Sequence, residues 1–143
     1  MHNTPGVLEL IDIQTGQVIA SLSINTNIIE DLQFILDDTM LVFRDMNDYW
    51  KLRFFRIENK RELFFRELTD ERPHEYLFDF AFNSDASKLA LSYRHKIDLI
   101  DFKEKKKVFE FNLDHCHKKA QIKFVNDLLG ARTDMGCFSL YRV

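Results

Sequence analysis

The residues best suited to metal chemistry stand together in the segment Asp114-His115-Cys116-His117. Imidazole nitrogen and thiolate sulfur are common zinc ligands, and a structural zinc site takes four of them. No pair in the segment has a Cys-x-x-Cys or His-x-x-x-His spacing, and on a strand His115 and His117 would point away from Cys116. We therefore expect no metal site and no cofactor. Metal binding or an enzymatic activity at His115, Cys116 and His117 stays as the alternative hypothesis.

The signatures of common enzyme classes are missing from the sequence. It has no glycine-rich phosphate loop, no Gly-x-Ser-x-Gly and no His-Glu-x-x-His, and only four glycines in total. Paired acids such as Asp37-Asp38 and Asp70-Glu71 stand in polar segments typical of turns. The sequence therefore predicts no catalytic residues and a protein that is not an enzyme.

Three arginines fall at or just past the end of an apolar stretch, and guanidinium groups bind carboxylate or phosphate through a planar fork. Aromatic residues and arginine are also enriched in binding hot spots. We therefore predict a surface that binds a protein or peptide partner, formed by Arg44, Tyr49, Trp50, Arg94, His95 and Arg132. The alternative is that Trp50 packs in the core and that each arginine pairs with a nearby aspartate. Those aspartates are Asp45, Asp98 and Asp134.

Charge and hydropathy exclude two classes of partner. The formal net charge of −3 gives no overall attraction to nucleic acid, and the short run Lys103–Lys107 is typical of a turn. The longest apolar runs, such as Met40–Phe43, are far shorter than a membrane-spanning helix. The first residues do not have the pattern of a secretory signal. We expect a soluble protein of the cytoplasm, with the nucleus as the alternative, and neither nucleic acid nor membrane as a partner.

An internal repeat organises the 143 residues. Three apolar-x-Phe units, each followed by a turn and a second apolar stretch, are Leu32-Gln-Phe34, Phe80-Ala-Phe82 and Ile122-Lys-Phe124. A third element recurs as Val7–Asp12, Lys51–Arg56, Lys96–Asp101 and Cys137–Arg142, and a fourth as Gln17–Ser23, Glu62–Leu68 and Lys107–Leu113. The equivalent residues Leu10, Phe54, Leu99 and Leu140 are 44, 45 and 41 positions apart. Each unit therefore predicts four sequential antiparallel strands.

Four strands in 41 to 45 residues are typical of a propeller blade. From about Val7 to Val143 the order of elements resembles WD-repeat proteins. Where that family ends its third strand in Trp-Asp, this chain has Ile11-Asp12, Phe55-Arg56, Ile100-Asp101 and Tyr141-Arg142, and it lacks the Gly-His dipeptide. The resemblance implies an all-β fold of WD40-like blades in one domain, residues 1–143. It also implies a non-catalytic scaffold that docks a protein or peptide within a larger assembly.

The predicted ring is incomplete. Thirteen strands make about three blades, whereas natural propellers have about four to eight. Three blades alone would leave two apolar faces uncovered, and such faces mark interaction surfaces. We expect blades from the same longer chain, from a partner or from a second copy to complete the ring. The alternative is that the chain is a structural fragment of a larger propeller.

One local pattern competes with the repeat. Ile28–Leu36 and Ile122–Leu129 also fit amphipathic helices, which would give an α+β fold. The matching segment Phe78–Phe82 alternates in the manner of a strand and is followed by a turn, so the repeat favours strands.

Overall fold

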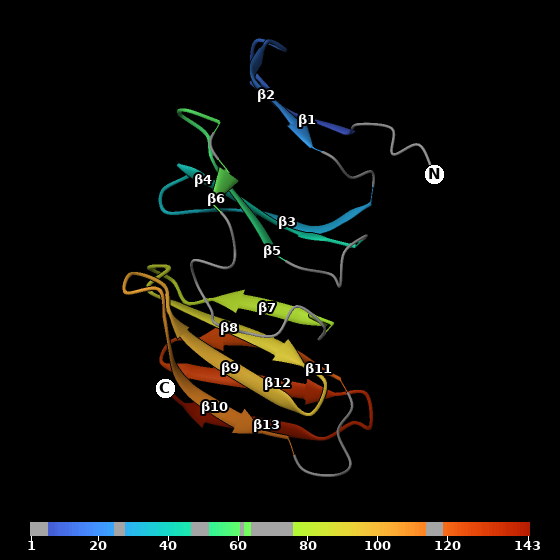
Figure 1. Cartoon of the computed structure of the whole chain (residues 1–143), viewed down its shortest axis with the longest axis vertical. Helices are drawn as coiled ribbons and strands as arrows, with labels where there is room; N and C mark the ends of the chain where they lie inside the picture. The colour runs from blue at the N-terminus through green and yellow to red at the C-terminus, as the bar shows by residue number, and fades with distance from the viewer. Residues whose placement is uncertain (1–5, 25–27, 47–51, 61, 64–75, 114–118) are drawn as a thin grey trace.

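The repeated elements form strands in four antiparallel sheets, which are stacked one after another in chain order (Figure 1). The computed structural model describes residues 6–24, 28–46, 52–60, 62–63, 76–113 and 119–143. Within these residues the strands are β1 (Gly6–Ile11), β2 (Val18–Ile24), β3 (Ile29–Ile35), β4 (Met40–Asp45), β5 (Leu52–Arg56), β6 (Glu62–Leu63), β7 (Asp79–Phe82), β8 (Lys88–Tyr93), β9 (Lys96–Asp101), β10 (Lys106–Asn112), β11 (Ala120–Val125), β12 (Leu128–Thr133) and β13 (Phe138–Arg142).

Each strand pairs with its neighbour in the chain, and two of the sheets are complete. The first sheet contains β1 and β2, the second β3 to β6, the third β7 to β10, and the fourth β11 to β13. The all-β prediction is confirmed, and the helical alternative is wrong: β3 and β11 occupy the two ambiguous segments. The described residues contain no helical span with the length and apolar character that a bilayer crossing requires.

The strand register confirms the repeat. Phe54, Leu99 and Leu140 each lie opposite the third residue of the preceding strand, which is Val42, Ala90 and Gly130 respectively. Each third strand also pairs with the fourth strand that follows it, and there Leu10 lies opposite Ala20, Phe54 opposite Leu63 and Leu99 opposite Phe109. The four residues therefore occupy one slot in four successive sheets.

Three apolar cores lie between the sheets. Leu22 and Ile24 of the first sheet pack against Leu41, Phe43 and Phe55 of the second. The third and fourth sheets share a core around Leu99, Ile122 and Leu129. The largest aromatic cluster lies between the second and third sheets.

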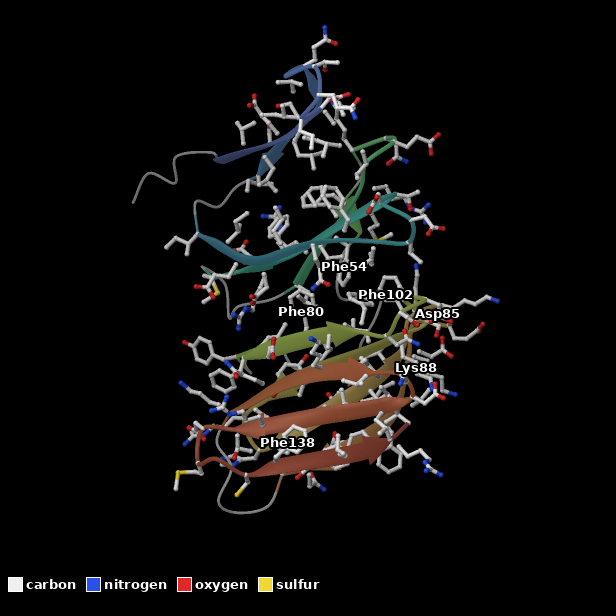
Figure 2. All side chains as sticks on the ribbon, turned by 180° about the vertical axis from the view of Figure 1, so that it is seen from behind. Phe54, Phe80, Asp85, Lys88, Phe102 and Phe138 are labelled. Carbon is white, nitrogen blue, oxygen red and sulfur yellow. The ribbon has the colours of Figure 1, made fainter. Side chains whose placement is uncertain are left out.

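In that cluster the ring of Phe54 lies 6.5 Å from Phe82 and 5.6 Å from Phe102, measured between centroids. Figure 2 shows Phe54, Phe80 and Phe102 in the space between the two sheets. Each of the two complete sheets is therefore buried on both faces, and stacking supplies most of the apolar burial of this fold.

The turns between third and fourth strands repeat as well. Gly16, Lys60 and Lys105 are each six residues past the common slot, and their φ angles are 70°, 55° and 53°. In two of these turns the aspartate that follows the third strand accepts backbone hydrogen bonds: Asp12 Oδ1 from Gln14 N at 2.8 Å, and Asp101 Oδ1 from Glu104 N at 2.9 Å. The acidic residues that support the resemblance to WD repeats therefore cap local turns.

The turn between β7 and β8 is held by its own side chains. Asn83 Oδ1 accepts a hydrogen bond from Lys88 N at 2.8 Å, and Asp85 Oδ1 accepts bonds from Ser87 N and Oγ at 2.9 and 2.6 Å. The hydrogen bond from the Ser87 hydroxyl is the main cause that lowers the pKa of Asp85. Polar side chains placed this way favour the tight turn that the sequence predicts.

The common slot provides a matched pair of substitutions. Phe54→Ala removes a fully buried ring, so we expect the free energy of unfolding to fall by about 3 to 5 kcal/mol. Leu140→Ala, at the equivalent but exposed position, should change it by no more than about 0.5 kcal/mol. Urea denaturation of both variants measures the difference. Equal losses would contradict the assignment of the buried and exposed sheets.

Candidate functional site

The turns after the second strands lie beside the segments that join one sheet to the next. Met46 N donates to Ile28 O at 3.0 Å, Leu113 N donates to His95 O at 2.8 Å, and Asp134 N donates to Lys119 O at 3.3 Å. We call the surface formed by Ile28, Met46, Tyr76, Arg94, His95, Lys119 and Asp134 the loop face. It is the surface on which the sequence places the candidate partner-binding residues.

Arg44 is buried, and its guanidinium contacts other parts of the chain. It forms ion pairs with Glu30 at 3.0 Å and Asp31 at 2.7 Å, and it donates to the carbonyl oxygens of Leu77 and Phe78. These contacts join the second sheet to the segment that leads into the third. Arg44 therefore has a structural role here, and we leave it out of the proposed binding surface.

Arg94, His95 and Arg132 are exposed. Arg94 and His95 form the two-residue turn between β8 and β9, where the φ of His95 is 69°. Arg132 lies near the end of β12, on the outer side of the fourth sheet. No ion pair of Arg94 or Arg132 is found among the residues that the structure describes. Tyr49 and Trp50 lie outside the described residues.

Two of the three aspartates expected near these arginines, Asp45 and Asp98, have other partners. Asp45 lies 3.3 Å from Arg53, and the buried Asp98 lies 3.2 Å from Lys96 and 3.9 Å from Lys107. Lys107 also bonds Glu110 at 3.1 Å, and this hydrogen bond lowers the pKa of Glu110. These ion pairs lie within single sheets.

The residues proposed for metal binding, His115, Cys116 and His117, lie outside the described residues. Among the residues that the structure describes, no group of three or more His, Cys, Asp or Glu side chains is placed to hold a metal ion. The metal hypothesis therefore has no support from the described part.

A carboxylate in the third sheet reaches the fourth. Asp79 Oδ2 accepts a hydrogen bond from Ile122 N at 2.7 Å, and Asp79 Oδ1 accepts one from Phe80 N at 2.9 Å. Burial raises the pKa of Asp79, although the two backbone donors act in the opposite direction. Asp79 is thus a polar link between sheets, and no feature of its local sequence predicts this role.

The largest exposed apolar residues of the last sheet share one face. The strand pairing places on it Gln121, Lys123, Val125, Leu128, Gly130, Arg132, Phe138, Leu140 and Arg142. We call this the forward face, because the corresponding face of the second and third sheets packs on the next sheet along the chain. Phe138 and Leu140 are 67% and 57% exposed, whereas the equivalent Leu52 and Phe54 are 1% and 0% exposed.

The side chains of the forward face are contiguous. Phe138 Cζ and Leu140 Cδ2 lie 3.6 and 3.7 Å from the position that a Cβ atom of Gly130 would take. Figure 2 shows Phe138 on the fourth sheet, far along the stack from the first sheet. The sequence predicts uncovered apolar faces, and the alternation in Phe138–Arg142 places Phe138 and Leu140 on one face of the strand.

The first sheet is exposed on the opposite side. Its outer side, which we call the backward face, carries Val7, Glu9, Ile11, Val18, Ile19, Ser21 and Ser23. Ile11 is 47% exposed, whereas Phe55 and Ile100 at the equivalent position are 4% and 0% exposed because a preceding sheet covers them. The two ends of the stack therefore expose two different faces.

An apolar cavity of about 50 Å³ lies between the first and second sheets. Its lining is Leu8, Glu9, Leu10, Ala20, Leu22, Leu32, Phe34, Leu41 and Ile57. Phe34 is equivalent to Phe82, which contacts Phe54 of the preceding sheet. The first sheet has Leu10 at the position of Phe54, so in the described residues Phe34 has no such aromatic partner, and the cavity lies beside these two side chains.

Comparison with known proteins gives structural matches alone. No family model matches the sequence, and no curated protein matches it. Among solved structures, the computationally designed Ika4 protein matches with a TM-score of 0.69 and 14% identity, over 96% of this chain and 80% of that chain.

Two further matches are propeller domains. The β-propeller domain of Cps50 (Swd1) from Myceliophteria thermophila has a TM-score of 0.71 and 19% identity, over 96% of this chain and 48% of that chain. The WD40 repeats of RRP9 have a TM-score of 0.64 and 15% identity, over 80% of this chain and 35% of that chain. This chain thus spans about half the length of the Cps50 (Swd1) chain and about a third of the RRP9 chain.

The Asp79 link predicts a dependence of stability on pH. Because burial raises the pKa of the folded carboxyl above its usual value, the folded state holds the proton more tightly than the unfolded state. Asp79 therefore contributes most stability at low pH, and that contribution is lost as pH rises through the folded pKa. Relative to Asp79→Asn, the wild type should lose stability as the pH rises above 3.8, the usual pKa of an aspartate side chain.

Denaturant unfolding of the two proteins across this pH range measures the effect. Asp79→Ala, which removes both acceptors, should cost about 1 kcal/mol for each lost hydrogen bond. A difference between wild type and Asp79→Asn that does not change with pH would contradict the assignment.

Proposed function

We propose that this chain, whose fold is that of WD40 β-propeller blades, is a non-catalytic scaffold that docks a protein partner within a larger assembly. Propeller blades of this kind generally serve protein interaction, and the ring here is not closed. Additional blades would complete it. The proposal includes cytoplasmic or nuclear residence, as expected from the sequence.

The exposure of Phe138 and Leu140 is the observation that carries the proposal. At the equivalent positions of the second and third sheets, the side chains are buried under the next sheet. An apolar patch with a polar rim is typical of a protein contact. Arg132 lies directly opposite Phe138 in the neighbouring strand, so a cation borders this patch.

The loop face supplies a second contact in the proposal. Arg94 and His95 are exposed in the turn between β8 and β9, and Tyr76 on the same face is also exposed. Arginine and tyrosine are both enriched at binding hot spots. With Arg132, these residues favour a partner that presents carboxylate or phosphate groups.

Substitutions on the two surfaces test the proposal in cells that express the chain. Phe138→Lys with Leu140→Lys places two charges on the forward face, so the native assembly that contains the chain should become smaller in size-exclusion chromatography of the extract. Val108→Lys is the matched control, because Val108 is exposed on the outer strand β10. A wild-type chain that elutes as a single polypeptide would contradict the proposal.

The arginine contact is tested by Arg94→Glu with Arg132→Glu. Reversal of both charges should weaken retention of the partner and leave thermal unfolding nearly unchanged, since both side chains are exposed. The assembly size and the melting temperature are measured together. An unchanged assembly would remove Arg94 and Arg132 from the binding surface.

A further inference from the structure

The stack pairs its faces according to one rule. At each of the three junctions, the forward side of one sheet packs on the backward side of the next. Leu52 and Phe54 meet Phe80 and Leu89 in this way. After three such junctions, one forward face and one backward face remain exposed, and they belong to the fourth and first sheets.

The two exposed faces differ in charge. Among the paired residues of β11 to β13, the forward face carries Lys123, Arg132 and Arg142 around its apolar centre and has no carboxylate. The described part of the backward face carries Glu9 among its apolar and serine side chains and has no base. Opposite charges steer association and suppress contacts between two faces of the same kind.

We propose that the forward face of one chain docks on the backward face of a second copy, so that the chain associates head to tail. The contact continues the stacking already present at the three internal junctions. It covers Phe138 and Leu140 of one copy with Ile11 of the other, as the equivalent Ile100 is covered inside the stack. The inference rests on the proposed scaffold function and names the partner of its forward face.

Geometry favours closure with two copies. A head-to-tail contact uses different surfaces on the two chains, so it either closes into a ring or continues as a filament. Two chains with four sheets each bring eight sheets, which is within the range of about four to eight blades in natural propellers. In such a ring the contact forms twice, and no apolar end face stays exposed.

The alternative occupants have less support. An extended peptide on the open edge of β1 would fill the cavity beside Leu10 and Phe34, but that cavity has no cluster of charges to select a partner. The loop face is charged and exposes Ile28 and Tyr76, whereas the forward face exposes Val125, Phe138 and Leu140.

Complementary charge reversals test the contact in purified full-length chain. One variant carries Lys123→Glu, Arg132→Glu and Arg142→Glu, which makes the forward face acidic. The second carries Glu9→Lys and Ser21→Lys, which makes the backward face basic; Ser21 lies opposite Glu9 in the sheet and is exposed. Each variant alone then has two end faces of like charge.

We expect the wild type to associate reversibly in sedimentation-velocity ultracentrifugation, with a dimer as the main species. Each variant alone should show a dissociation constant raised by at least about tenfold. A mixture of the two variants should regain association, because each acidic face then meets a basic one. This recovery shows that both variants are folded, and circular dichroism spectra that match the wild type confirm it.

A wild type that stays monomeric at every concentration overturns the inference, as does an oligomer that neither variant weakens or a mixture that does not recover. If the purified chain is monomeric but Phe138→Lys with Leu140→Lys still shrinks the assembly in extracts, the second copy is excluded while the scaffold proposal stands. If neither experiment responds, both fail.

Discussion

A sheet with two apolar faces needs a neighbour on each side, and this requirement governs the whole chain. The second and third sheets meet this requirement, since the side chains of Phe54 and Leu99 are buried between neighbouring sheets. Hydrophobic burial is roughly proportional to the area removed from water. The inner sheets therefore hold the stack together, and the outer sheets are supported on one side only.

The strand order and the register could be predicted from the sequence because both depend on local patterns. The apolar-x-Phe units ending at Phe34, Phe82 and Phe124 lie at matching positions, opposite Leu41, Leu89 and Leu129. Polar turn residues separate them at regular distances, and side chains alternate between faces along each strand. The amphipathic helix hypothesis failed for Ile28–Leu36 because a turn interrupts the pattern at Leu36 to Thr39, where Thr39 N bonds Leu36 O.

The candidate site was predicted less well, because the partners of long charged side chains are decided by the packing of sheets. Arg44 reaches the carbonyl groups of Leu77 and Phe78, which are more than thirty residues away. Asp79 bonds Ile122 in the next sheet for the same reason. The exposed Phe138 looks like an ordinary core residue in the sequence, and only the missing neighbour distinguishes it from Leu52.

Hydrogen exchange of dilute protein, followed by mass spectrometry, tests the central claim that stacking on both sides stabilises the inner sheets. The equivalent third strands are β1, β5, β9 and β13, so their amides can be compared at one slot of the repeat. The account predicts that β5 and β9 exchange much more slowly than β1 and β13, because local opening is easiest where apolar contacts are few. Equal protection of all four strands would contradict it.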